Sequence, residues 1–193
     1  RRVLFRSDPR LSRAFITKQG TSGKEQAPGT ADNAVYAPNG TPEQGTSKYG
    51  TSLFMYSISA PTLLLSYHEL KFLEAEALCR LERDAKSALK DAVVAGLLNA
   101  ENSFTISRKE LGKTLINAAS SITEAEAESY FDNTIEAKYT AEPLKTTMTQ
   151  KYFALWGASG EATESYNDVR RMKGLGENFI ELKNPNSFPL RCP

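Results

Sequence analysis

Several residue types that carry chemistry are scarce in this chain. Its 193 residues include one histidine, His68, and two cysteines, Cys79 and Cys192. These counts exclude a zinc finger, a disulfide framework and a histidine-rich metal site. Long apolar runs are missing as well. The longest, 61–65 and 93–98, are far shorter than the roughly 20 residues that a bilayer-spanning helix needs.

Charge of one sign is also lacking. The chain has 24 basic and 23 acidic residues, which argues against non-specific nucleic-acid binding and against a polybasic membrane anchor. The sequence contains no G-x-S-x-G, no phosphate-binding P-loop and no G-x-G-x-x-G. Apolar residues make up 40% of the chain, enough for the core of one domain or for a piece of a larger one.

Both ends of the sequence look unnatural. Residues 1–7, RRVLFRS, resemble the translation of a short-read sequencing adapter. We expect them to be an artefact and leave them out of the fold; a natural basic stretch is the alternative. Without their three arginines, 21 basic residues face 23 acidic ones. The other end stops abruptly at Pro193, so we expect residues 8–193 to be a gene fragment.

Residues 18–60 differ in composition from the rest of the chain. The stretch 18–50 holds six of the twelve glycines and three of the nine prolines, with few apolar residues. This composition predicts a long loop with a short hairpin. A loop of that length in a compact domain is commonly functional or disordered.

From Pro61 onward, apolar residues recur at the three- to four-residue spacing of helices. Helices are expected over 61–81, 84–98, from 107, 123–139, 143–156 and 161–172. Asp84 is a predicted N-cap, Thr123 and Glu126 form a capping box, and Gly174 and Gly176 end the last helix. We predict an all-α fold, a tetratricopeptide-like helical-hairpin array over 61–173, followed by an irregular tail, 174–193.

Candidate catalytic groups are few. His68-Glu69 does not begin an H-E-x-x-H motif because position 72 is Phe, so we favour a solvated helix face with a half-buried histidine over a metal site. Glu74 or Glu161 with Asp168 could form a glycosidase pair, but the sequence fixes no carboxylate separation. We expect no catalytic residue and no metal or cofactor.

Other conspicuous residues have ordinary structural interpretations. Arg170 and Arg171 are expected to complement the helix dipole and to pair with Glu161, Glu164 or Asp168, in preference to clamping a ligand. Trp156, at helical spacing with Tyr152 and Phe153, is expected in the core in preference to stacking on a ligand. Cys79 is expected to be an inert core thiol.

The loop-rich segment contains Tyr36, Tyr49 and Tyr56 among Asn, Gln, Thr and Gly. Aromatic rings with nearby amide and hydroxyl groups suit a neutral sugar, whose CH groups stack on rings and whose hydroxyls form hydrogen bonds. Any solvated loop has a similar composition. We select Tyr36 and Tyr49 as candidate ligand-binding residues.

Three segments together resemble SusD/RagB-type nutrient-binding lipoproteins. Residues 61–77 are similar to the family's P-x-x-x-x-x-Y-x-E-x-x-F-x-x-A-E-A helix, and 150–155 to its Q-K-aromatic-x-A-L segment. Residues 161–171 are similar to its E-x-W-x-D-x-R-R helix, with Tyr166 in place of the usual Trp. Each motif alone is weak, but their order and spacing are specific.

The resemblance implies an all-α protein anchored by an N-terminal lipid at the cell surface, on the outer membrane of Bacteroidetes-like bacteria. Such proteins are not enzymes; they capture an oligosaccharide or a peptide for a SusC-type TonB-dependent transporter. Some members bind calcium, but no site can be assigned here. The fragment would correspond to about the last two-fifths of a member.

A helical-repeat scaffold that binds a protein or peptide partner is the alternative function; no nucleic-acid partner is expected. The long polar loop favours the ligand-capturing protein, since a pure scaffold rarely needs such an insertion. Because solenoid repeats stabilise one another, losing the preceding repeats would expose an apolar helix face. We therefore expect the fragment to aggregate or to be molten when expressed alone.

Overall fold

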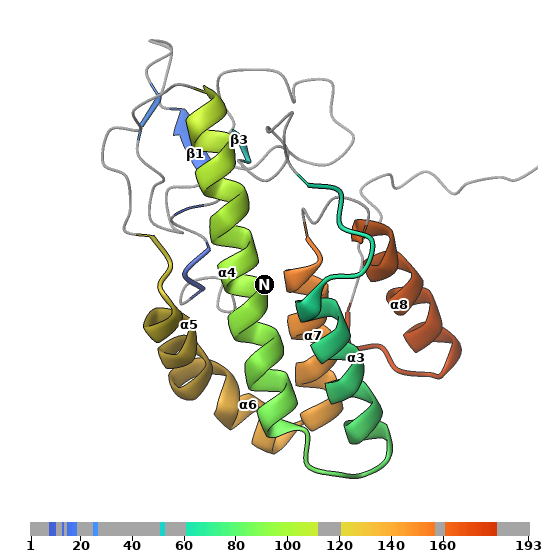
Figure 1. Ribbon diagram of the computed structural model, residues 1–193. Helices are drawn as coiled ribbons and strands as arrows, with labels where there is room; N and C mark the ends of the chain where they lie inside the picture. The colour runs from blue at the N-terminus through green and yellow to red at the C-terminus, as the bar shows by residue number, and fades with distance from the viewer. Residues whose placement is uncertain are drawn as a thin grey trace, which may run out of the picture.

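The computed structural model describes residues 8–10, 13, 15–18, 25–26, 51–52, 61–111, 121–156 and 161–180. Helices dominate this part of the chain, which confirms the predicted all-α fold (Figure 1). The helices are α3 (Tyr67–Arg80), α4 (Lys86–Leu111), α5 (Glu124–Tyr130), α6 (Glu136–Ala141), α7 (Pro143–Ala154) and α8 (Ala162–Gly174). A π-helical segment, η2 (Phe131–Ile135), joins α5 to α6.

A small antiparallel sheet accompanies the helices. Its strands are β1 (Phe15–Lys18), β2 (Glu25–Gln26) and β3 (Thr51–Ser52), in the order β2-β1-β3. Thr17 lies opposite Gln26, and Phe15 lies opposite Ser52. The sequence predicts a short hairpin within 18–50. Strand β2 lies in that stretch, whereas β1, its antiparallel partner, precedes it except for Lys18.

Helix α3 begins later than the apolar pattern predicts. Residues 61–66 are not helical, and Ser66 caps the helix: its hydroxyl accepts the backbone N–H of Glu69 at 3.1 Å. A side-chain acceptor at this position satisfies one of the free N–H groups of the first turn. The leucines at 63–65 therefore precede the helix.

A single helix, α4, occupies the region where the sequence predicts two. The expected break between Leu98 and Ser107 is wrong, because α4 runs uninterrupted from Lys86 to Leu111. Ala100 and Phe104 continue its buried face across that break. Their burial outweighs the low helix propensity of Asn102 and Ser103, which lie between them, and of Thr105. Leu115, Ile116 and Ala119, which the sequence assigns to the helix predicted from 107, lie outside the described residues.

The caps that the sequence predicts are present with one small shift. Thr123 and Glu126 form the reciprocal capping box of α5. Asp84 accepts the N–H of Lys86 at 2.9 Å, so it serves the first turn of α4 from one residue before the cap position. The segments α5, η2 and α6 then continue as the helix predicted over 123–139.

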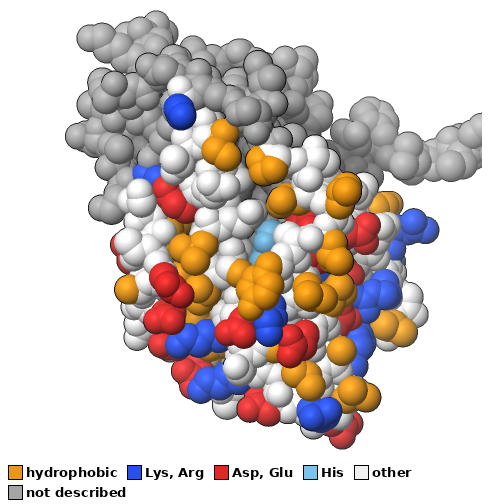
Figure 2. Space-filling view, in the orientation of Figure 1, with side chains coloured by type: hydrophobic (Ala, Val, Ile, Leu, Met, Phe, Trp, Pro, Cys, Tyr) orange, Lys and Arg blue, Asp and Glu red, His pale blue; other side chains and the backbone are white. Residues whose placement is uncertain are grey.

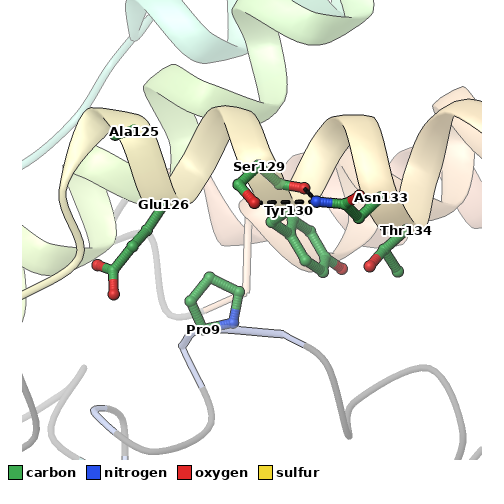
Figure 3. Close-up of a pocket in the computed structure, with 7 residues that line it drawn as sticks. All are labelled: Pro9, Ala125, Glu126, Ser129, Tyr130, Asn133 and Thr134. Carbon is green, nitrogen blue, oxygen red and sulfur yellow. Dashed lines mark hydrogen bonds between the residues drawn. The ribbon is translucent and has the colours of Figure 1, made fainter.

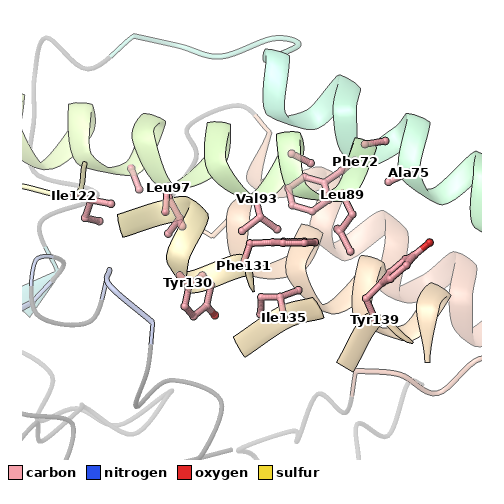
Figure 4. Close-up of a cluster of buried hydrophobic side chains, with 14 of the residues drawn as sticks. Phe72, Ala75, Leu89, Val93, Leu97, Ile122, Tyr130, Phe131, Ile135 and Tyr139 are labelled. Carbon is pink, nitrogen blue, oxygen red and sulfur yellow. The ribbon is translucent and has the colours of Figure 1, made fainter. Parts of the chain in front are cut away.

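The apolar core lies between α3, α4 and the α5–η2–α6 segment (Figure 4). Phe72 and Ala75 enter it from α3, and Phe131 and Ile135 enter from η2. Among the side chains of α4 that the structure describes, the buried apolar residues are Ala88, Leu89, Ala92, Val93, Leu97, Ala100 and Phe104. Helix α4 is thus the central element around which the others pack.

Gly96 allows a close approach between α4, α7 and α3. A Cβ placed on Gly96 would lie 3.2 Å from Cβ of Ala154 and 3.9 Å from Cδ2 of His68. That space is tight for a side chain, so a glycine here lets the three helices meet. None of the helices in the described part of the chain is long and apolar enough to span a bilayer.

Candidate functional site

Polar side chains are buried where α3, α7 and the start of α8 meet. His68 and Glu69 lie in the first turn of α3, Lys151 lies in α7, and Glu161 immediately precedes α8; all four are buried. Glu161 accepts the backbone N–H of Ser66, and its Oε2 lies 3.6 Å from Nε2 of His68. The N-cap of α3 is therefore tied to the beginning of α8.

The charges of this cluster are shifted from their ordinary states. Burial, followed by a hydrogen bond with Glu161 and the charge of that residue, raises the pKa of Glu69 to about 7. Burial lowers the pKa of His68, against the opposing effect of Glu161. At neutral pH His68 is neutral, and Glu69 retains its proton in a large share of the molecules.

A chain of ion pairs continues from the cluster along α8. Lys151 contacts Asp168 at 2.7 Å, and Asp168 also accepts a hydrogen bond from Arg171 at 2.7 Å. Arg171 forms a two-point contact with Glu76 of α3. Burial opposes ionisation of Glu76, but hydrogen bonds from Arg171 and Arg80 hold its pKa below the ordinary value. These pairs fasten α8 to α3 and α7.

The structural role predicted for Arg171 is confirmed, with one partner that the sequence did not indicate. Its contact with Asp168 was among the expected pairs. Its contact with Glu76 joins residues 95 positions apart, a distance at which helical spacing gives no signal. Arg170 lies over the ring of Tyr166, with Cζ 5.8 Å from the ring centre.

The carboxylates considered as a glycosidase pair have structural partners. Glu161 is 1% exposed, and the oxygens of Asp168 contact Lys151 and Arg171. Glu74 lies on the exposed side of α3, where Lys71 contacts it at 3.0 Å. Hydrolysis requires two carboxyl groups that flank a sugar bond, so this arrangement favours structural roles for all three.

Among the described residues, no group of three or more His, Cys, Asp or Glu side chains is arranged to hold a metal ion. Cys79 packs against the core with its Sγ 3.6 Å from Oγ1 of Thr147, and burial raises the pKa of its thiol. A raised pKa disfavours the reactive thiolate, in agreement with the expected inert role.

The prediction that Trp156 lies in the core is wrong, because its side chain is 38% exposed. Helix α7 ends at Ala154 with Leu155 as its C-cap. Trp156 therefore follows the helix, and helical spacing from Tyr152 and Phe153 no longer fixes the side on which it lies.

An open hollow of about 460 Å³ lies between Pro9 and the outer side of α5 and η2 (Figure 3). Its lining residues are Pro9, Ala125, Glu126, Ser129, Tyr130, Asn133 and Thr134. Asn133 donates to the carbonyl and the hydroxyl of Ser129 at 2.9 Å, and Glu126 accepts the N–H of its cap residue. Since Tyr130 is buried, the hollow offers hydrogen bonds without an exposed ring for stacking.

The two tyrosines predicted to bind ligand, Tyr36 and Tyr49, lie outside the described residues, so their role stays a prediction. The described residues instead bring together polar residues from all three sequence motifs. Five of the polar motif residues, Glu69, Glu76, Lys151, Asp168 and Arg171, belong to the buried cluster and its ion-pair chain. The motifs thus encode the contacts among α3, α7 and α8.

A solved structure, the crystal structure of a SusD/RagB family protein from Bacteroides thetaiotaomicron VPI-5482, is similar to this chain. The two are 61% identical, the match covers 95% of this chain, and the TM-score is 0.85. The chain spans 39% of the length of that protein. Neither a family model nor a curated protein matches the sequence. Because identity and fold agree along nearly all of its residues, the chain belongs to the SusD/RagB family, as its motifs predicted.

Proposed function

We propose that the protein containing this chain binds a nutrient at the cell surface and passes it to a SusC-type TonB-dependent transporter of the outer membrane. The observation that carries the proposal is the 61% identity to a SusD/RagB family protein. The chain corresponds to 39% of that relative, so the activity is proposed for the whole protein. An oligosaccharide is the proposed ligand; a peptide is the alternative.

The roles of the polar residues support binding in preference to catalysis. Glu161 and Asp168 hold helices together, and their carboxyl oxygens face other side chains and backbone of the same chain. A family of binding proteins needs a stable scaffold under a variable ligand face. The shared motifs then specify the scaffold and leave the choice of ligand to other residues.

We propose that residues 8–193 form the C-terminal part of one SusD/RagB-like domain. In this arrangement the helical region 61–173 supports the loop-rich segment 18–60, which supplies the ligand face, and 174–193 is an irregular tail. Residues 1–7 have no role. Attachment to the outer membrane comes from a lipid on an N-terminal cysteine outside these residues.

Tyr36 and Tyr49 are the proposed ligand contacts. The test measures binding of short oligosaccharides from starch, xylan, mannan and host glycans to the full-length protein by titration calorimetry. Tyr36→Ala and Tyr49→Ala are expected to weaken the best ligand about tenfold each, the loss of roughly 1.4 kcal/mol of stacking. Tyr166→Ala is the matched control, since Tyr166 is 58% exposed on α8. If Tyr36→Ala and Tyr49→Ala both bind the ligand as tightly as the parent protein and the Tyr166→Ala control do, the tyrosine site is refuted.

The function itself is tested separately from the site. Full-length protein carrying an affinity tag is purified from outer membranes after mild solubilisation. Recovery of a TonB-dependent barrel, together with binding of any oligosaccharide or peptide, supports the uptake proposal. Recovery of a different protein, with no barrel and no affinity for saccharides, would instead favour the helical scaffold.

A further inference from the structure

One side of α3 carries a row of exposed apolar side chains. We define the outer face of α3 as Tyr67, Leu70, Leu73, Ala77 and Leu81. Its four large side chains are between 42% and 66% exposed, and Leu64 and Leu65 extend the row before the helix. The three- to four-residue spacing places these residues in one stripe. Figure 2 shows hydrophobic side chains over the region that α3 occupies in Figure 1.

The opposite side of α3 is already packed. Phe72 and Ala75 are fully buried in the core, against α4 and the helices behind it. The helix therefore has apolar side chains on two opposite sides. Apolar side chains on two opposite sides are typical of a helix that has a neighbour on each side.

Polar residues border the outer face and are paired with one another. Lys71 contacts Glu74 at 3.0 Å and Asp91 of α4 at 3.4 Å, and its Nζ lies 5.9 Å from the ring centre of Tyr67. An apolar centre with a charged border has the composition of a protein–protein contact surface and differs from a solvated face.

The length of the family relative allows for a further segment that covers this surface. It is 61% identical to the chain, yet the chain spans 39% of its length, so most of that relative has no counterpart among these residues. In helical-hairpin arrays each unit buries its apolar side against the next unit along the array. A neighbouring amphipathic helix is the structure that fits an apolar stripe with this spacing.

We infer that the outer face of α3 packs against an amphipathic helix of the full-length protein that lies outside these 193 residues. The inference concerns the internal architecture and does not depend on the ligand or the transporter. It specifies the chemistry of the missing helix: an apolar stripe that meets Leu70 and Leu73, flanked by polar residues near Lys71 and Glu74.

Thiol accessibility in the full-length protein tests this inference. Leu70→Cys is compared with Glu128→Cys, an exposed position on α5, in a background where Cys79 and Cys192 are serine. A covered Leu70→Cys should react with a maleimide more than about a hundredfold more slowly than the control, and both should react alike in denaturant. Ala77→Cys repeats the measurement if Leu70→Cys does not fold.

A photo-crosslinking amino acid at Leu73 identifies the covering segment. We expect the crosslinked peptide, mapped by mass spectrometry, to lie outside residues 1–193 of the same polypeptide. Fast labelling of both Cys variants at every protein concentration would overturn the inference. Protection that appears at high protein concentration alone, or a crosslink to a second copy, to the transporter or to residues within 1–193, would overturn it too.

Discussion

Helices α4 and α8 are held in the fold by different forces. The buried side of α4 is a long apolar surface at the centre of the core, whereas Met172 is the buried residue of α8. Charged side chains add further contacts between α8 and its neighbours: Asp168 with Lys151, and Arg171 with Glu76. Apolar burial tolerates salt and moderate changes of pH, while ion pairs depend on both. We expect α8 to open before α4 when the protein is destabilised.

This contrast gives the family motifs a physical meaning. Five of their polar residues lie where α8 meets α3 and α7, and there each charged side chain needs a particular partner. The apolar face of α4 carries no motif because many combinations of apolar residues fill a core of the right volume. Specific residues are required where a buried charge would otherwise be left without its partner.

The largest expected loss of stability follows from a change in the apolar contact between α3 and α4. Phe72→Ala removes a ring that is 0% exposed between α3 and α4, and large-to-small changes in such cores cost about 4 kcal/mol. Chemical denaturation of the full-length protein measures the loss in the free energy of unfolding. Leu175→Ala is the control, since Leu175 is 58% exposed and its truncation should stay within about 0.5 kcal/mol. Similar losses in both variants would contradict the assignment of the core.

Lys151→Met tests the ion pair that joins α7 to α8. It leaves Asp168 without its buried cation, although Asp168 keeps Arg171, so we expect a loss of about 2 kcal/mol. The control on the same helix is Lys145→Met, whose partner Glu142 is well exposed; it should cost less than about 0.5 kcal/mol.

Hydrogen exchange distinguishes the two kinds of junction. In Lys151→Met the amides of α8 should exchange faster than in the parent protein, while those of α4 keep their protection. An equal increase in both helices would show that α8 is part of the same cooperative unit as the core, and the contrast between the helices would be lost.

Local signals in the sequence were sufficient for most helix positions. The apolar spacing and the capping box at Thr123 predicted α5 to α7, and Gly176 predicted the end of α8. The break expected after Leu98 was wrong because burial of Ala100 and Phe104, which is a tertiary effect, overrides propensity. Long-range pairs such as Arg171 with Glu76 have no local signature. The family motifs indicated these residues without revealing what they contact.

The raised pKa of Glu69, in the buried polar cluster, makes the stability of the protein depend on pH. Its folded pKa is about 7, while an unfolded glutamate has a pKa near 4.3. Between these values the unfolded chain releases the proton and the folded chain keeps it, so the stabilising contribution of Glu69 is complete below the lower value and is lost as pH rises toward the upper one. The lowered pKa of His68 acts in the opposite direction on acidification.

Glu69→Gln isolates the contribution of this residue, because glutamine resembles the protonated acid at every pH. Relative to the parent protein, the variant should gain about 1 kcal/mol of stability between about pH 5 and pH 8, after allowance for solvent screening. Glu74→Gln, on the exposed side of the same helix, is the matched control. A stability difference that is constant with pH in Glu69→Gln would show that the carboxyl group titrates as it does in water.

The smallest expected effect compares how α3 and α8 end. Both helices finish with the same kind of backbone hydrogen bond, from an N–H to the carbonyl five residues earlier. In α3 it joins Arg83 to Leu78, and in α8 it joins Glu177 to Met172, each at 2.9 Å. The residue that reverses the chain has a positive φ in both, 55° at Glu82 and 77° at Gly176. A glycine adopts this conformation freely, whereas a glutamate must overcome contact between its Cβ and the backbone.

Opposite substitutions at these two positions should therefore have opposite signs. Glu82→Gly is expected to stabilise the full-length protein by about 0.5 kcal/mol, since relief of the left-handed strain exceeds the added freedom of the unfolded chain, and Gly176→Ala to destabilise it by about 1 kcal/mol. Thermal unfolding at several denaturant concentrations resolves both changes. If α8 opens before the rest, Gly176→Ala will speed hydrogen exchange in α8 alone, whereas Glu82→Gly will raise the stability of the whole core. If Gly176→Ala instead lowers the global free energy of unfolding by the full value of about 1 kcal/mol, α8 unfolds together with α4, despite the charges that hold it.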